Sequence, residues 1–557
     1  MVVPDDRTGA AGMAAAVGVS GFCRAAGVTS EYAYKRRRVD TGTIMYHAHI
    51  GLSTWDATYE ALSFVAGELS ADGYVLDRFG LCLDRAMSLP EAQRHLVSRE
   101  TGPVLTSPEW AAVGGQSVSQ PHLGDFMIGT AASDENSARA LEHGVTTIGN
   151  LGQFFSFDVP GGSDNRQLTA ATVKAIERMA AGRHRGAVVH SYLDDGPAMQ
   201  LAHYGNYLGW AAVECHLVET VMGARLTHCF GGLVPQPRAR AVLALALPQL
   251  HPRDHLGSMI YGNTVDYTKD LVRNQTVLAN YLLVDIATQL HRPSGHAVNP
   301  VPLTENVRIP DAADILQVQR LGREIEREAR RSGDIFDWAR LESEAADGAD
   351  YAREWAVRAL EVLEADGVDV TDPAKTLLAL REIDVTRLQA RVRVTRRSSL
   401  TNLEPWKAGV QRTLVQEVLD AAVVRLDGQR IILASLDVHD VVRDVLIKVL
   451  STLGAEVVLL PGDSHPAAAV HAAVQEDADV IIASTYNGAA LRQANQLVQA
   501  ARQFAFDGRI IMGGVLNEDL GEPVPTDVTE QVRALGIHCI DDLRRLPELV
   551  QRLPESA

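Results

Sequence analysis

The chain of 557 residues is too long for one ordinary folding unit, so we expect at least two domains. Apolar residues make up 46% of the chain and charged residues 22%, which is typical of a globular protein and excludes wholesale disorder. The net charge of −18 repels phosphate backbones and anionic lipid surfaces. We therefore expect no nucleic acid and no membrane among its partners.

The cysteines are scattered, without a CxxC pair or a spacing that would form a zinc site. Reduced thiols in a cytoplasmic protein are the expectation. Residues 10–27 are small and apolar, but Asp5 and Asp6 precede them where a secretory signal needs positive charge, and the stretch is too weakly hydrophobic to cross a bilayer. The cysteines are Cys23, Cys82, Cys215, Cys229 and Cys539.

In chain order, residues 1–41 show no clear period and predict a mobile N-terminal arm, with the basic run Lys35-Arg36-Arg37-Arg38 in solvent. Residues 42–330 alternate short β-like runs with segments of helical period. Such alternation over this length predicts a (β/α)₈ TIM barrel as the catalytic domain. The β-like runs include 73–76, 145–148, 187–190, 225–230 and 258–261.

Several of these runs end in clusters of glycine, asparagine, histidine or tyrosine, such as Gly149-Asn150, His190-Ser191-Tyr192 and Tyr261-Gly262-Asn263. The carboxyl ends of barrel strands face the active site, so these clusters supply candidate site residues. Turn formation also favours Gly and Asn and accounts for the pattern equally well.

Residues 331–428 are charged and helical in period, which predicts a helical accessory region. A new βαβ series begins at Arg430, with strands near 430–434, 456–460, 479–483 and 509–512. This series predicts a second α/β domain over residues 429–557, doubly wound and flavodoxin-like.

The strongest motif is Asp437-Val438-His439, which follows the first strand of that domain. A histidine at the carboxyl edge of such a sheet faces the ligand crevice. An aspartate two residues earlier can accept a hydrogen bond from the far nitrogen of the imidazole. The pattern therefore suits a metal-ligating histidine tuned by a carboxylate.

The domain resembles the cobalamin-binding domain of adenosylcobalamin mutases and methionine synthase. In those proteins a D-x-H-x-x-G motif is followed by a serine-containing loop and then by Gly-Gly. The resemblance implies that His439 ligates cobalt with Asp437 behind it, and that the nucleotide tail of the cofactor lies beside the sheet. The family glycine falls on Val442, which fills space that the family leaves open. The matching later positions are Ser484, Tyr486, Gly513 and Gly514.

Residues 45–420 resemble, more weakly, the barrel subunit of glutamate mutase, fused here to its cobalamin subunit. The resemblance implies that Glu214 holds the substrate ammonium and that Glu305 contacts the adenosyl ribose. An exposed helix-surface carboxylate is the alternative for Glu214. Candidate residues of the barrel mouth are Arg85, His190, Tyr192, Glu214, Tyr261 and Glu305.

The family grips the two carboxylates of glutamate with three arginines, whose planar guanidinium groups suit a carboxylate. Here one falls near Arg85, and the others fall on or near Met127 and Ser191; a family lysine falls on Val301. The sequence therefore predicts a substrate other than glutamate.

The resulting hypothesis is an adenosylcobalamin-dependent isomerase, a carbon-skeleton mutase that acts by radical rearrangement on a small acid or amino acid. The resemblance to glutamate mutase favours a homodimer. Two alternatives stay open: a corrinoid methyl-transfer protein and a non-catalytic cobalamin-binding sensor. Against them, the sequence shows no zinc-thiolate cluster, no methyl-donor domain and no DNA-binding module.

Overall fold

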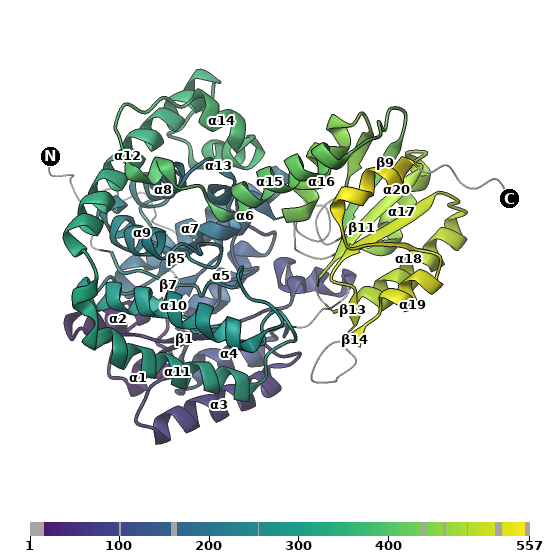
Figure 1. Cartoon of the computed structure of the whole chain (residues 1–557). Helices are drawn as coiled ribbons and strands as arrows, with labels where there is room; N and C mark the ends of the chain where they lie inside the picture. Colours follow the sequence, from purple (N-terminus) through teal and green to yellow (C-terminus); the bar gives the residue numbers. More distant parts are fainter. Residues whose placement is uncertain are drawn as a thin grey trace. The chain divides into compact units, whose positions relative to one another are not determined.

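A computed structural model describes residues 16–97, 99, 102–157, 164–253, 255–436, 441–460, 464–486, 488–518 and 526–551. The chain divides into two compact units, Met1–Trp406 and Lys407–Ala557 (Figure 1). No helix within the described ranges is long and apolar enough to cross a membrane.

Parallel strands form the centre of the first unit. Strands that follow one another in the chain pair with one another, partly through single bridges such as Leu123 with Ile148 and Phe230 with Ile260. A further parallel bridge joins Tyr46, just before β1, to Val298 of β8, so the last strand is connected to the first. The strands are β1 (His47–Ile50), β2 (Arg78–Leu81), β3 (Gln120–His122), β4 (Thr147–Ile148), β5 (Val188–Tyr192), β6 (Leu226–Cys229), β7 (Met259–Ile260) and β8 (Ala297–Val298).

Helices alternate with these strands and bury apolar faces against them. Because successive strand side chains point to opposite faces, Ala48 and Ile50 of β1 join the apolar core while His47 and His49 share the other face. The helices that follow the strands are α3 (Trp55–Ala71), α4 (Ser107–Gly115), α5 (Ser133–Glu142), α6 (Leu151–Ser156), α7 (Asn165–Gly182), α8 (Tyr204–Cys215), α9 (Pro237–Leu250), α10 (Leu271–His291) and α11 (Ala312–Arg331).

The structure corrects the prediction of a mobile arm for residues 16–41, which form α1 (Gly21–Ala25) and α2 (Glu31–Asp40). Ser20 and Ser30 cap these helices with their side chains. Lys35 is buried and donates to the carbonyl oxygens of Gly257 and Ser258, so it is not in solvent as the basic run suggested. Composition alone missed this because the buried partners of Glu31 and Lys35, which are Arg78, Gly257 and Ser258, lie far along the chain.

The predicted accessory region is helical. Its long helix α12 packs on α8 and α9, and the Trp355 ring lies so close to Gly209 that a Cβ there would sit 2.6 Å from it. Apart from Trp406, α15 belongs to the second unit, where Val418 joins the core. The helices are α12 (Trp338–Ala365), α13 (Pro373–Glu382), α14 (Val385–Arg391) and α15 (Trp406–Ala421).

The second unit is a parallel sheet in the order β10-β9-β11-β12-β15, covered by helices on both faces (Figure 1). This order is the 2-1-3-4-5 arrangement of flavodoxin-like domains, as the sequence predicts. Its elements are β9 (Arg430–Ser435), α16 (Val441–Thr452), β10 (Glu456–Leu459), α17 (Pro466–Gln475), β11 (Val480–Thr485), α18 (Ala490–Phe504), β12 (Arg509–Gly514), β13 (Asn517–Glu518), β14 (Thr526–Asp527), α19 (Thr529–Ala534), β15 (His538–Ile540) and α20 (Leu546–Gln551).

Candidate functional site

The carboxyl ends of the central strands of the second unit align two of the predicted positions, Ser484 and Gly513. Ser484 of β11 lies opposite Ser435 of β9 on one side and opposite Gly513 of β12 on the other. Strand order reverses between β9 and β11, and doubly wound sheets bind ligands at such a switch point, outside the carboxyl ends. The register therefore places these positions at the ligand-binding edge.

A cavity of about 560 Å³ opens beside this edge, within the size range of small-molecule sites. Its wall is mostly aliphatic, with a few polar side chains. This combination fits a group that has both an apolar ring and polar substituents. The lining residues are Leu414, Glu417, Val418, Val442, Leu446, Ile482, Ala483, Ser484, Tyr486, Gly513, Gly514, Ile540, Asp541, Asp542, Leu543, Arg544 and Leu546.

The two glycines are required by the backbone geometry at this edge. Gly514 has φ +102°, and a Cβ there would lie 2.1 Å from the Thr485 carbonyl oxygen. A Cβ on Gly513 would lie 2.8 Å from Ile540 Cγ2. Side chains at these positions would push β12 away from its neighbours, so the glycines keep the wall of the cavity smooth and close to the sheet.

Asp437 and His439 lie outside the described residues. They stand in the chain between Leu436, which follows β9, and α16. Val442, at the position of the family glycine, lines the cavity, so the cavity keeps its volume with a valine in its wall.

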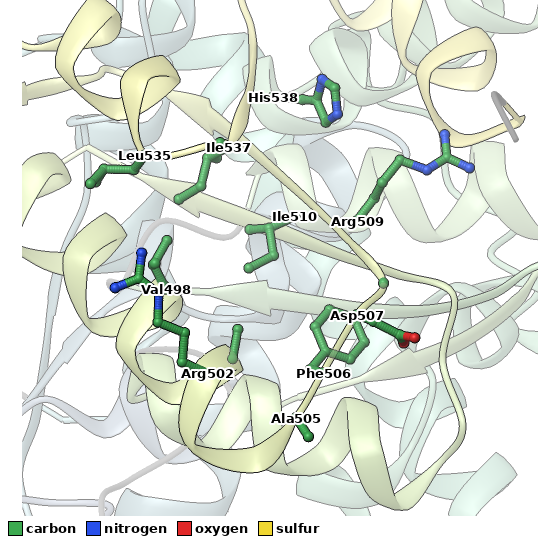
Figure 2. Close-up of a pocket in the computed structure, with 13 residues that line it drawn as sticks. Val498, Arg502, Ala505, Phe506, Asp507, Arg509, Ile510, Leu535, Ile537 and His538 are labelled. Atoms are coloured by element: carbon green, nitrogen blue, oxygen red, sulfur yellow. The ribbon is translucent and has the colours of Figure 1, made fainter. Parts of the chain in front are cut away.

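A second cavity of about 500 Å³ lies at the opposite edge of the sheet (Figure 2). Arg509 and His538 begin β12 and β15, whereas Gly513 and Gly514 end β12. Figure 2 shows Arg509 and His538 among the residues that line this cavity, with Phe506 and Asp507 from the turn before β12. Because ligands of this fold bind at the carboxyl edge, this cavity is not the predicted site.

In the first unit, histidines from three strands gather inside the ring of strands. The ring centroids of His47 and His122 are 5.9 Å apart, and those of His122 and His190 are 4.5 Å apart. Burial, followed by the charge of the nearby Arg78, lowers the pKa of His190, and burial also lowers that of His47 and His122. The three imidazoles are therefore neutral near pH 7.

Charged groups lie next to this histidine cluster. Arg78 donates to Ser258 Oγ at 3.2 Å, and His190 Nδ1 lies 2.8 Å from the same oxygen. The Arg78 Nε atom lies 3.0 Å from Glu31 Oε1, and both side chains are buried. Helix α2 thus supplies the counter-ion of Arg78, which begins β2, at the amino ends of the strands.

Aromatic side chains continue the interior toward the carboxyl ends. The rings of Tyr192 and Tyr261 stack with centroids 5.4 Å apart, and His49 lies 5.0 Å from Tyr261. Asn299 Nδ2 is 3.3 Å from His49 Nδ1. The structure therefore brings Tyr192 and Tyr261 together, and His190 lies two residues before Tyr192 on the same face of β5.

Glu305 belongs to the same end. Burial raises the pKa of the Tyr261 hydroxyl well above its usual range, and the charge of Glu305 contributes to that shift. Glu305 is open to water, yet the protein around it raises the pKa of its carboxyl to about 7. Arg85 begins the turn after β2, also at a carboxyl end.

Glu214 lies elsewhere. It is 2% exposed, inside α8, where its carboxylate accepts a hydrogen bond from Trp210 Nε1 at 2.8 Å and lies 3.1 Å from His228 Nε2. The alternative of an exposed helix-surface carboxylate is therefore wrong. The contact of Glu214 with substrate stays a prediction. In the structure its carboxylate already contacts Trp210 and His228.

Sequence reasoning missed the polar residues that complete the interior: His47, His49, Arg78, His122 and Asn299. One signal was available, because His47-Ala48-His49 repeats histidine at the period of two that places both on one face of a strand. The others stand singly in short runs, and only strand pairing brings them together.

Comparison with known proteins bears on the second unit. Residues 430–524 match the B12 binding domain, a range that covers β9 and the cavity-lining positions from Val442 to Gly514. The chain therefore carries a B12-binding domain of flavodoxin-like fold at its C-terminus, and the predicted cobalamin-binding protein is confirmed at that level.

Among solved structures, a novel cobalamin-binding protein from Desulfitobacterium hafniense DCB-2 is similar at 16% identity, over 39% of this chain and 83% of the other, with a TM-score of 0.19. A search of the curated proteins found no match.

Proposed function

We propose that the protein is an adenosylcobalamin-dependent isomerase of the carbon-skeleton mutase type, acting on a small acid or amino acid other than glutamate. One observation carries the proposal: the chain that holds a B12-binding domain in its second unit also holds a first unit whose parallel strands enclose polar and aromatic side chains. A domain that only stored or sensed the cofactor would need no such interior.

The first unit is proposed to be a (β/α)₈ barrel. Strands β1 to β8 pair in chain order, helices alternate with them, and the bridge between Tyr46 and Val298 connects the last strand to the first. Active sites of such barrels lie at the carboxyl ends of the strands, which is where Tyr192, Tyr261 and Glu305 belong.

The proposed roles follow from chemistry and burial. Bound adenosylcobalamin supplies radical chemistry by homolysis of its cobalt–carbon bond. Arg85 is suited to bind one substrate carboxylate, and the neutral His190 can donate or accept a hydrogen bond without bringing a charge. Tyr192 and Tyr261 present a stacked aromatic wall that excludes water from the reacting groups.

In the second unit, His439 is proposed to ligate cobalt, with Asp437 accepting a hydrogen bond from its other ring nitrogen. The aliphatic cavity beside Ser484, Gly513 and Gly514 is proposed to hold the nucleotide tail.

Electron paramagnetic resonance of the cob(II)alamin form tests whether His439 is the cobalt ligand: ¹⁵N labelling of the protein should change the superhyperfine splitting. Unchanged splitting would mean that the nucleotide base is the ligand.

The activity is tested by anaerobic incubation of the reconstituted protein with candidate acids and amino acids, followed by detection of 5′-deoxyadenosine. A mutase forms it in the presence of its substrate. A corrinoid methyl-transfer protein or a cobalamin sensor forms none, and methyl transfer from added methyl donors identifies the former.

A further inference from the structure

Three chemically reactive side chains from separate elements of the first unit meet in its buried part. Cys215 ends α8, His228 is on β6, and His251 follows α9. One sulfur or ring nitrogen of each lies within 4.8 Å of the other two, and all three residues are buried. Cys215 Sγ is 3.7 Å from Nδ1 and 3.9 Å from Nε2 of His251.

Both histidines have a carboxylate partner on one ring nitrogen. His228 Nε2 is 3.1 Å from Glu214 Oε2, and His251 Nδ1 is 2.8 Å from Glu219 Oε2. The second nitrogen of His228, Nδ1, is buried without a hydrogen-bond partner. Histidines that bind metals usually carry such a carboxylate on the nitrogen that faces away from the ion.

The local charge also favours a cation. Glu214 is 2% exposed and Glu219 is 4% exposed, and the ion pairs that the structure shows for them are with these two histidines. An imidazole balances a carboxylate only when it is protonated, whereas a divalent ion held by both histidines would stabilise both carboxylates without that requirement.

We propose that Cys215, His228 and His251 bind a divalent metal ion, Zn²⁺ by their ligand chemistry. Thiolate and imidazole together select zinc, with Zn–S near 2.3 Å and Zn–N near 2.0–2.1 Å. Tetrahedral angles then separate S and N by roughly 3.5 Å. Cys215 Sγ lies 3.9 Å from Nε2 of His251, the ring nitrogen that does not contact Glu219.

The ion serves the fold. Glu219 lies in a π-helical turn, His216–Val221, that continues α8, and its Oε1 also accepts from the Leu226 backbone N–H at the start of β6. The site therefore ties α8, β6 and the end of α9 together. It is separate from the interior of the strands, because His228 points toward α8 whereas Cys229, its neighbour, belongs to a cluster with Met45 and Met259.

The full-length chain is tested after chelation and titration with Zn²⁺ alone. Inductively coupled plasma mass spectrometry should find one zinc per chain, distinct from the cobalt of a corrin. Zinc K-edge X-ray absorption should show one sulfur at about 2.3 Å and nitrogen or oxygen neighbours at about 2.0–2.1 Å. Absorption without a sulfur neighbour, or no zinc bound by the wild type, overturns the proposal.

Variants provide the matched comparison. Cys215→Ser should weaken zinc binding at least tenfold, whereas Cys229→Ser, also buried and one residue from His228, should bind as the wild type does. Chelation should lower the thermal midpoint of the wild type and of Cys229→Ser but not of Cys215→Ser. Equal zinc affinity in the wild type, Cys215→Ser and Cys229→Ser contradicts the site. If a variant does not fold, the zinc K-edge spectrum of the wild type alone tests the proposal, through the presence or absence of a sulfur neighbour.

Discussion

The interior of the first unit and the carboxyl edge of the second are built on opposite principles. In the second unit, an aliphatic cavity borders a sheet whose strands end in serine and glycine, and contiguous motifs mark its wall. In the first unit, buried histidines, Arg78 and tyrosines from separate strands contact one another. The difference teaches that a cavity at the end of one parallel sheet can be predicted from short motifs, whereas a polar interior is specified by pairing between distant strands.

The largest effect should come from breaking the buried ion pair of the polar interior. Arg78→Met leaves the Glu31 carboxylate buried with Lys35, 3.7 Å away, as its remaining cation. Loss of one partner of a buried pair costs about 3–5 kcal/mol. Denaturation followed by tryptophan fluorescence measures this, since all six tryptophans lie at or before Trp406 and report on the first unit.

Arg320→Met is the control, because Arg320 forms exposed pairs with Glu68 and Asp72 and should be removed with little change. If both variants unfold at the same denaturant concentration as the wild type, the Arg78–Glu31 ion pair does not stabilise the first unit. The proposed difference between its polar interior and the cavity of the second unit would then be wrong.

A smaller effect is expected at the edge of the second sheet. Gly514→Ala adds a Cβ at φ +102° against the Thr485 carbonyl, which should cost about 1–3 kcal/mol and weaken cobalamin binding. Circular dichroism should show an earlier transition of the second unit while the tryptophan transition stays in place. Gly536→Ala is the control: Gly536 has φ +87°, but an added Cβ would meet no atom within 4 Å, so this variant has the backbone strain without the clash. It should therefore have a smaller effect on the thermal transition and on cobalamin binding.

Substitution of Glu305 should weaken the binding of adenosylcobalamin but not of hydroxocobalamin. Two ribose hydroxyls can donate to its carboxylate, and one charge-assisted bond is worth about 1.5–3 kcal/mol. Glu305→Gln should therefore weaken adenosylcobalamin about tenfold and leave hydroxocobalamin, which has no ribose, unchanged. Exposed Glu324→Gln is the control. Equal weakening of both cofactors would make Glu305 a structural carboxylate.

The same residue predicts a pH dependence. Burial raises the pKa of Glu305 from 4.5 to about 7, so the folded protein holds this proton as pH rises from 4.5 and loses it near 7. The preference for adenosylcobalamin over hydroxocobalamin should therefore grow between pH 6 and pH 8 in the wild type and stay constant in Glu305→Gln. By linkage, Glu305 disfavours folding progressively over the window from pH 4.5 to 7.

The smallest expected signal is turnover of glutamate. Met127 and Ser191 stand at or near two of the arginine positions, and a dicarboxylate bound without those cations is disfavoured by several kcal/mol. Chromatography of anaerobic reactions should detect no 3-methylaspartate above background. Robust formation of it would show that other cations serve the second carboxylate.

Ser191 illustrates what the sequence could and could not predict. It lies between His190 and Tyr192 on β5, so its side chain points away from the face that they share, which the short run by itself did not reveal. In the second unit, the predicted flavodoxin-like fold is confirmed, and Ser484, Gly513 and Gly514 lie at the carboxyl ends of β11 and β12, because these strands have a clear apolar pattern. Helix α2 and the Cys215 group were missed because their partners are distant in the chain.

The contacts of α2 also govern how the chain reaches its fold. Lys35 bonds to Ser258, 223 residues later, and the bridge from Tyr46 to Val298 spans a similar distance. Closing such long loops is entropically costly, and contacts between remote residues slow folding. During synthesis, the carbonyl oxygens that accept from Lys35 exist only once residues 257 and 258 have been added. The contacts that bury Lys35 of α2 are therefore completed late in translation.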